Sequence, residues 1–222
     1  LIAILFNAFI FADYSNHKDS KEVIDELVNE HGFEESYVIN VLKQAKKRKT
    51  ALNSVARPAE KTKTWDDYRT IFLKKKRISD GKKFIQNNIT VLERAEKEFG
   101  VPKEVITAIL GVETDYGNIM GSYRVIDSLT TLGFDDPRRS KFFKSELIQF
   151  FILTRENNLD ILKVKGSYAG AMGYGQFISS SYRAYAIDFD GDGYVDLFNS
   201  LEDAIGSTAN YLKRHGWKKE LS

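Results

Sequence analysis

Apolar residues recur every three or four positions along much of this 222-residue chain, which is the spacing of one face of an α-helix. Val23, Ile24, Leu27 and Val28 show this spacing near the start, and residues 105–112 repeat it in a more apolar form. A segment that alternates apolar and polar residues, as a half-buried strand does, is not found at useful length. The sequence therefore predicts a mainly α fold.

Helix start and stop signals mark the first expected helices. One begins at the pattern Asp19-x-x-Glu22, which resembles a capping box, and ends at Gly32. A second has its apolar residues within 38–45, and the basic run 43–49 is expected to form its solvated face rather than a specific anion site.

The later helical segments are more apolar. One long helix is expected over 84–99, closed by Gly100 at a C-cap. Pro102 suits the first turn of a strongly apolar helix that ends near Gly117, and residues 142–151 predict another buried helix.

A soft boundary at Gly100 divides the expected architecture. It gives a helical N-terminal domain over 13–100 and a core domain over 101–222. Residues 1–12 are apolar apart from Asn7 and too short to span a bilayer, which takes roughly 20 residues. They suit the end of a secretory signal peptide, and a buried N-terminal helix or strand is the alternative.

Composition excludes several classes of function. The chain has 33 Lys and Arg against 31 Asp and Glu, a balance that does not predict nucleic-acid binding. It has no cysteine, which excludes disulfides, thiolate metal sites, cysteine nucleophiles and the acylated cysteine of a lipoprotein.

Glu113 is the first candidate for chemistry. Ile106, Leu110 and Glu113 are spaced i, i+4 and i+7, so the carboxylate shares the apolar stripe and is expected to be largely buried. Burial raises the pKa of a carboxyl group, as a general acid near neutral pH requires. The alternative is a glutamate at a helix end that turns to water or caps a neighbouring turn. Asp115 lies about 200° further around the helix, so the two carboxylates do not face one substrate from it.

Residues 166–177 form a second unusual segment, rich in glycine and alanine. Ser167, Tyr168, Tyr174 and Gln176 offer polar groups beside aromatic faces, as a sugar-binding cleft requires. A tight loop that packs two helices together is the alternative.

The third candidate is an acidic loop that begins at Asp188. Asp188, Asp190 and Asp192 occupy positions 1, 3 and 5 of a calcium-binding EF-hand loop, followed by Gly193 at position 6 and the Tyr194 carbonyl at position 7. The pattern predicts a structural Ca²⁺ site with no catalytic role, and an acidic turn without metal is the alternative.

The loop departs from the EF-hand pattern at position 12, where Asn199 replaces the bidentate glutamate. Glu202 and Asp203 could each supply the missing carboxylate. Because Asn199-x-x-Glu202 resembles a capping box, Asp203 is the favoured ligand.

Five segments in this order resemble the membrane-bound lytic transglycosylase B family, over roughly Val23 to Trp217. They are Gly111-Val112-Glu113-Thr114, Asp136-Pro137-Arg138-Arg139, the segment 166–177, the Asp188 loop and Asp203-Ala204-Ile205-Gly206-Ser207. The resemblance implies a lysozyme-like helical core with an EF-hand-like calcium loop over 188–203. It also implies cleavage of the bond between N-acetylmuramic acid and N-acetylglucosamine in peptidoglycan, with a 1,6-anhydromuramic acid end.

The resemblance assigns roles to particular residues. Glu113 is implied as the catalytic acid and base, with Ser167 and Gln176 near it in the cleft. Arg138 and Arg139 are implied to bind peptide or lactyl carboxylates, and Tyr211 to form part of the sugar-binding wall. Two departures are Phe142, where the family has tyrosine, and Ser179-Ser180-Ser181 in place of Pro-Ser-Ser, where a serine cap is still expected. The family's late β-rich portion is expected to be absent.

The expected protein is therefore a periplasmic, monomeric enzyme exported through a signal peptide. Peptidoglycan strands are its expected substrate, without an organic cofactor, and proteins of cell-wall synthesis or lysis are possible partners. A non-catalytic peptidoglycan-binding or scaffold protein is the alternative.

Overall fold

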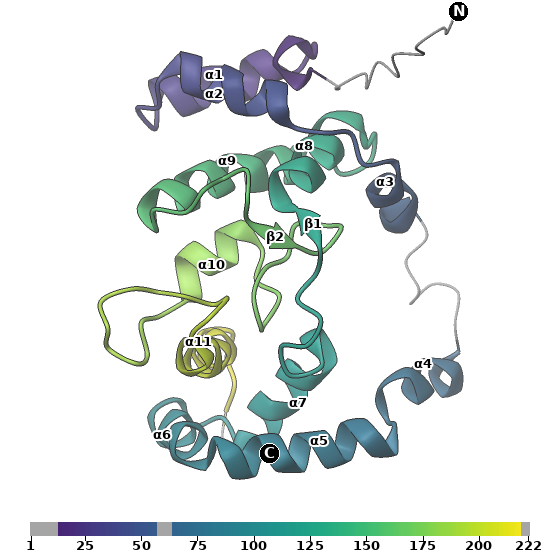
Figure 1. Ribbon diagram of the computed structural model, residues 1–222, viewed down its shortest axis with the longest axis vertical. Helices are drawn as coiled ribbons and strands as arrows, with labels where there is room; N and C mark the ends of the chain where they lie inside the picture. Colours follow the sequence, from purple (N-terminus) through teal and green to yellow (C-terminus); the bar gives the residue numbers. More distant parts are fainter. Residues whose placement is uncertain (1–12, 57–63, 219–222) are drawn as a thin grey trace, which may run out of the picture.

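The computed structural model describes residues 13–56 and 64–218, and it confirms a mainly α fold. A short 3₁₀ helix, η1, precedes the α-helices, and two short strands lie among them (Figure 1). In chain order the elements are η1 (Tyr14–Asn16), α1 (Ser20–Asn29), α2 (Glu35–Gln44), α3 (Lys49–Ala56), α4 (Trp65–Phe72), α5 (Lys75–Asn87), α6 (Ile89–Phe99), α7 (Lys103–Thr114), β1 (Tyr123–Arg124), α8 (Val125–Asp135), α9 (Ser140–Glu156), β2 (Lys165–Gly166), α10 (Ser179–Tyr185) and α11 (Leu201–Arg214). The predicted signal-peptide remnant at 1–12 and the loop at Pro58 lie outside the described residues.

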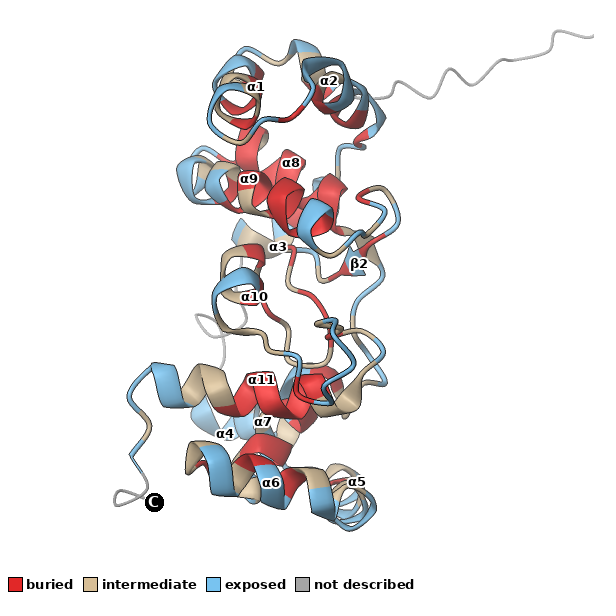
Figure 2. Cartoon of the chain, turned by 90° about the vertical axis from the view of Figure 1, so that its left-hand side faces the viewer, coloured by how far each residue is buried: buried red, intermediate tan, exposed pale blue. Residues whose placement is uncertain are grey.

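Two hydrophobic clusters form the interior, one at each end of the long axis (Figure 2). The larger packs α1, α2 and α3 against α8, α9 and α10, and every residue from Val125 to Phe134 is buried. The smaller joins α6, α7 and α11 through Leu92, Ile106 and Ile205. Both ends therefore combine elements from before and after Gly100, and the domain division at that residue stays a prediction.

The helix expected over 84–99 is interrupted. α5 ends at Asn87 and α6 begins at Ile89, with Asn88 between them at φ −122° and ψ 23°. The Asn88 side-chain amide donates to the carbonyl of Phe84 at 2.8 Å, and such local bonds compete with the helix ladder. The prediction of one long helix was therefore wrong, whereas the left-handed Gly100 that ends α6 was predicted.

Two other helix starts differ from the predicted pattern. Asp19 does stand at the N-cap of α1, but its side chain makes no cap hydrogen bond, so no capping box forms with Glu22. Pro102 is the N-cap of α7 rather than a residue of its first turn.

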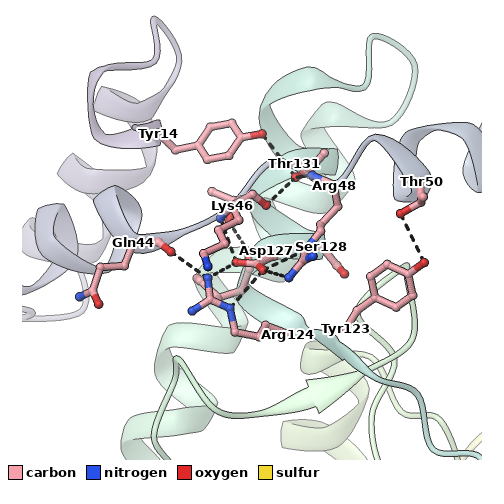
Figure 3. A network of polar contacts seen from close by, with 12 residues as sticks. Tyr14, Gln44, Lys46, Arg48, Thr50, Tyr123, Arg124, Asp127, Ser128 and Thr131 are labelled. Atoms are coloured by element: carbon pink, nitrogen blue, oxygen red, sulfur yellow. Dashed lines mark hydrogen bonds and ion pairs between the residues drawn. The ribbon is translucent and has the colours of Figure 1, made fainter. Parts of the chain in front are cut away.

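A buried carboxylate ties the connection between α2 and α3 to α8. Asp127 is fully buried, and its oxygens accept bonds from the Lys46 backbone N–H at 2.9 Å and from the guanidinium groups of Arg48 and Arg124 (Figure 3). Arg124 also donates to the Gln44 carbonyl. Two cations and one amide thereby satisfy a charge that burial alone would disfavour.

Strands β1 and β2 form a single antiparallel pair, with Tyr123 opposite Gly166. β1 runs directly into α8, and β2 leads into the glycine-rich segment, so the pair fixes that segment to the larger cluster. Within the described residues, no helix is both long enough and apolar enough to cross a bilayer.

Candidate active site

A cavity of about 390 Å³ opens between α7, the glycine-rich segment, α10 and α11. Its lining is largely apolar with a few polar groups, as small-molecule sites usually are. The residues that line it are Ile109, Glu113, Gly175, Gln176, Phe177, Ile178, Ser181, Thr208, Tyr211 and Leu212. Glu113 is the one acidic or basic side chain among these described residues.

Glu113 lies in the last turn of α7, at the point where the apolar stripe leaves the core. Ile106 and Leu110 are fully buried, but Glu113 is exposed, so the prediction of a largely buried carboxylate was wrong. The reason is that Glu113, the last residue of the apolar stripe, faces the cavity, whereas Ile106 and Leu110 face packed helices. The surrounding protein still removes water from the carboxylate, and this desolvation raises the pKa of Glu113 above its ordinary value.

The end of α7 is held by the residues that follow it. Asp115 and Tyr116 both have positive φ, at 52° and 60°, which turns the chain sharply after Thr114. The Tyr116 hydroxyl donates to the Arg77 carbonyl at 2.9 Å, and Arg77 pairs with Asp115 at 3.3 Å. A Cβ on Gly111 would come within 2.7 Å of the Tyr116 ring, so this position requires glycine.

The glycine-rich segment forms a tight hairpin at the cavity wall. Met172 and Phe177 pair as an antiparallel bridge, which leaves residues 173–176 as the turn. Gln176 has φ 51°, and its side-chain amide donates to the carbonyls of Met120 and Gly173. The turn thus places the predicted residue Gln176 in the cavity lining, in a conformation that its own side chain stabilises.

Two other predicted residues of this segment serve its folding instead. The Ser167 hydroxyl accepts bonds from the backbone N–H groups of Ala169 and Ala171 and does not line the cavity. The Tyr174 ring packs against Gly117, and the Tyr174 carbonyl accepts the Thr114 hydroxyl at 2.8 Å. The segment therefore lines the cavity and also joins neighbouring elements, and its role in binding sugars stays a prediction.

Tyr211 lies in the cavity lining on α11, as predicted. Its ring stacks on His215 with centroids 4.0 Å apart and meets the Phe177 ring edge-on at 5.6 Å. These contacts fix the orientation of an aromatic wall across the cavity.

Arg138 and Arg139 are exposed in the connection between α8 and α9, outside the cavity lining. Arg138 lies 3.7 Å from the carboxylate of Asp136, and the guanidinium of Arg139 stacks on Phe142 at 4.6 Å. The structure therefore does not bring this pair into contact with Glu113.

The three loop aspartates predicted as metal ligands lie together. Asp188, Asp190 and Asp192 each place a carboxylate oxygen within 4.8 Å of the other two, and all three are exposed. Asp188 accepts backbone bonds from Gly191, Asp192 and Gly193, a compact turn that gathers the acids. Three converging carboxylates form an oxygen-rich donor set that suits Ca²⁺.

Asp203 lies beneath this loop rather than among the converging acids. It is 1% exposed, and its two oxygens accept the backbone N–H groups of Phe189, Asp190 and Asp196. Burial raises the pKa of its carboxyl group. Both of its oxygens thus shape the loop.

The N-cap of α11 differs from the predicted one. Ser200 is the cap, and its hydroxyl accepts the Asp203 backbone N–H, so Asn199 does not form a capping box with Glu202. Glu202 instead pairs with Arg94 of α6 at 3.0 Å. The serine cap expected on α10 is also absent: Ile178 is the N-cap, and the buried carboxylate of Glu146 accepts the Ser180 backbone N–H and hydroxyl.

A family model described as the transglycosylase SLT domain matches residues 15–222. The chain belongs to this family. The predicted resemblance to lytic transglycosylases is thereby confirmed.

Relatives of this transglycosylase domain are similar in sequence and structure. Membrane-bound lytic murein transglycosylase B of Escherichia coli (strain K12) is 42% identical over 216 residues, which cover 93% of this chain and 60% of that protein. The catenated lytic transglycosylase SltB1 from Pseudomonas aeruginosa is 46% identical with a TM-score of 0.89, covering 93% of this chain and 68% of that chain. The Escherichia coli lytic transglycosylase Slt35 in complex with calcium is 40% identical with a TM-score of 0.88, covering 99% and 70%.

Several residues that line the cavity of this transglycosylase domain were not predicted. Thr208 precedes Tyr211 by three positions on α11, and Ile109 precedes Glu113 by four on α7. Helical spacing from the two predicted residues would have found both. Ser181 of α10 carries no such signal, because its place depends on how α10 packs.

Proposed function

We propose that this domain is a lytic transglycosylase that cleaves peptidoglycan strands between N-acetylmuramic acid and N-acetylglucosamine and leaves a 1,6-anhydromuramic acid end. The observation that carries the proposal is a single carboxylate, Glu113, in a cavity walled by the Gln176 amide and the Tyr211 ring. Family membership supports the same reaction class.

In the first step, the protonated Glu113 carboxyl group donates its proton to the glycosidic oxygen. The bond from that oxygen to C1 of the muramic acid breaks, and the N-acetylglucosamine side leaves as an alcohol. The raised pKa of Glu113 supports this role, because a larger share of the carboxyl group stays protonated as the pH approaches neutrality.

In the second step, the Glu113 carboxylate removes the proton from the C6 hydroxyl of the same muramic acid. The C6 oxygen then bonds to C1 and closes the anhydro ring. Glu113 is protonated again, as it was at the start, and no water is consumed. Two-carboxylate glycosidases need a second acid as nucleophile or to activate water. Among the described residues that line this cavity, no second carboxylate is present for either role.

The cavity walls give the substrate its orientation. Tyr211 offers a ring face for a sugar, and Gln176 and Thr208 offer hydrogen-bonding groups in the same cavity lining. Ser167, which the resemblance places in the cleft, maintains the turn that supports this wall. Arg138 and Arg139 are exposed cations suited to peptide or lactyl carboxylates further along the strand.

The acidic loop is proposed as a structural Ca²⁺ site. The carboxylates of Asp188, Asp190 and Asp192 and the Tyr194 carbonyl would hold the ion, and Asp203 would keep the loop in shape from beneath. The ion would neutralise the three clustered charges and take no part in the reaction at Glu113. The Slt35 complex with calcium supports this assignment.

The proposed substrate places the protein in the periplasm. Peptidoglycan surrounds the cytoplasmic membrane, so an enzyme that cleaves it must be exported. The apolar residues 1–12 are consistent with export through a signal peptide.

Mass spectrometry of the products released from purified sacculi tests the proposed function. The wild-type chain should release muropeptides with 1,6-anhydromuramic acid ends, and Glu113→Gln should release them roughly 100-fold more slowly or slower still. Products with reducing N-acetylmuramic acid would show hydrolysis instead. Binding to sacculi without any product from the wild-type chain would favour a non-catalytic peptidoglycan-binding protein.

A further inference from the structure

A second cavity, of about 490 Å³, lies where the turn between α1 and α2 meets the C-terminal end of α9. These elements lie toward the opposite end of the long axis from α7, which carries Glu113 (Figure 1). Among the residues that line it are Phe33, Glu34, Tyr37, Arg155 and Asn158, and none of them lines the Glu113 cavity. It is therefore a separate site that the proposed reaction does not use.

Two aromatic rings give this second cavity a flat apolar surface. The rings of Phe33 and Tyr37 are nearly parallel, at 10°, with centroids 6.3 Å apart. The buried Phe151 ring meets both edge-on, at 5.8 and 6.3 Å, which holds them in place. Phe33 is buried, whereas Tyr37 is 43% exposed and available to a ligand.

Hydrogen-bonding groups of both kinds surround these rings. The Arg155 guanidinium lies 4.0 Å from the centroid of Phe33 and donates to the His31 carbonyl at 2.7 Å, which fixes a donor-rich group at the cavity. Asn158 has φ 51° and its backbone N–H donates to the Arg155 carbonyl, so its amide is placed by a tight turn. The exposed Glu34 carboxylate provides acceptors.

This combination selects among ligand chemistries. A purely anionic ligand would be repelled by Glu34, and a purely apolar ligand would desolvate Arg155 and Glu34 without replacing their bonds to water. A pyranose ring has an apolar face that packs on an aromatic ring. Its hydroxyl and acetamido groups require donors and acceptors together, which Arg155, Asn158 and Glu34 supply.

We propose that the second cavity is a non-catalytic binding site for N-acetylhexosamine units of a glycan strand. The proposal rests on the proposed function, because it makes the ligand another segment of the same polymer. A strand or sacculus presents many identical units, so a weak second contact raises the effective concentration of substrate at the Glu113 cavity. A short soluble fragment that reaches only one site gains nothing from it.

Cosedimentation with purified sacculi tests this site, with each variant carried in the Glu113→Gln background so that binding is measured without turnover. Tyr37→Ala should weaken binding about fivefold, the loss expected for one ring contact. Tyr37→Phe should bind as well as the parent, because the ring is retained. Trp65→Ala, which removes a 72% exposed aromatic ring on α4, is the matched control and should leave binding unchanged.

Catalytic measurements separate this proposal from the proposed function. In the protein that retains Glu113, Tyr37→Ala should release product more slowly from sacculi, but at the wild-type rate from short soluble glycan fragments. Unchanged sacculus binding by Tyr37→Ala, equal loss by Trp65→Ala, or an equal loss of rate on short fragments would overturn the second site. Failure of the wild-type chain to form anhydro products would overturn the proposed function instead. Chemical denaturation of Tyr37→Ala shows whether it folds. If it does not, Tyr37→Leu keeps an apolar side chain against Phe151 but removes the ring, and it should weaken sacculus binding in the same way.

Discussion

The hydroxyl of Thr114 donates to the carbonyl of Tyr174 at 2.8 Å, while its oxygen accepts the backbone N–H of Gly117 at 3.0 Å. This buried side chain directly follows Glu113 and joins the end of α7 to the glycine-rich hairpin. The Thr114 hydroxyl therefore helps to set the relative positions of Glu113 and the Gln176 wall, together with the contacts of Gln176 to Met120 and of Tyr174 to Gly117.

Thr114→Val should lower both stability and turnover. The variant keeps the shape of the side chain but leaves a carbonyl and an N–H without their partner, at about 1–3 kcal/mol. Thr130→Val is the matched control, since the Thr130 hydroxyl bonds only the Ile126 carbonyl of its own helix among the described residues. Urea unfolding and product release from sacculi measure the two effects. Equal turnover in both variants would show that Thr114 does not position the site.

The pH dependence of the rate should report Glu113. The first step needs the protonated carboxyl group, so kcat/KM should fall as pH rises through the folded-state pKa of Glu113, which desolvation raises above the ordinary value. Glu113→Gln cannot donate the proton and should lose roughly 100-fold or more in rate. A Glu113→Gln enzyme with near wild-type turnover would remove Glu113 from the mechanism.

The same shift predicts how Glu113→Gln affects stability. A carboxyl group whose pKa is higher in the folded than in the unfolded protein destabilises the fold at pH values above the folded-state pKa, because it must ionise where ionisation is unfavourable. Below its unfolded-state pKa the group is protonated in both states and has no such effect. Glu113→Gln should therefore melt no lower than wild type at neutral pH, and any gain should disappear in acid. Melting curves across this pH range measure it, and a large loss at neutral pH would contradict the argument.

The helices were predictable because their apolar spacing is local, whereas the breaks between them depend on competing bonds. The stripe through Ile106 and Leu110 predicted α7 and the face that carries Glu113. The interruption at Asn88 was missed because it depends on a side-chain bond to Phe84 that the spacing does not reveal. The exposure of Glu113 was missed because helical spacing shows which face of the helix a residue lies on, but not whether another element covers that face.

In the candidate site as well, helical spacing and motifs predicted which residues lie near the cavity, but not which bonds their side chains make. Gln176 and Tyr211 were predicted to line the cleft, and the hairpin and α11 do bring them to one cavity. Ser167 was predicted with them, but its hydroxyl bonds within its own turn. Asp203 was predicted as a ligand because a capping box was expected to occupy Glu202, and only the structure shows that its buried oxygens accept backbone N–H groups of the loop.

Calcium should stabilise the protein through the acidic loop. An ion that binds only the folded state adds about 2.7 kcal/mol at a hundredfold excess over its dissociation constant, so EDTA should lower the Tm. Asp190→Asn should show a smaller response to added calcium, whereas Asp66→Asn, an exposed acid of α4, should respond as wild type does. Superimposable melting curves with EDTA and with calcium would leave the loop as an acidic turn.

Asp203 and Glu202 should differ even without calcium. Asp203→Ala leaves three backbone N–H groups without an acceptor: that of Phe189 is buried, at about 1–3 kcal/mol, and those of Asp190 and Asp196 are partly buried and cost less. Glu202→Ala removes an ion pair with Arg94 in which both side chains are more than 40% exposed, worth at most about 1 kcal/mol. Unfolding in EDTA measures both. A loss for Asp203→Ala that appears only with calcium present would make Asp203 a ligand rather than a support of the loop.

Asp127→Ala should be among the most destabilising single substitutions in the larger cluster. The Asp127 carboxylate is fully buried, and its removal leaves the guanidinium groups of Arg48 and Arg124 without their common partner. Removing one member of a buried ion pair costs about 3–5 kcal/mol, and the lower end applies here because both arginines are partly exposed.

Asp25→Ala, which removes an exposed pair with Lys21, is the control and should cost at most about 0.5 kcal/mol. Urea unfolding at low and high salt measures the difference: the Asp127 effect should persist at 1 M salt, because salt screens buried charges far less than exposed ones. A cost for Asp127→Ala no larger than that for Asp25→Ala would show that the connection between α2 and α3 is held by apolar packing rather than by this carboxylate.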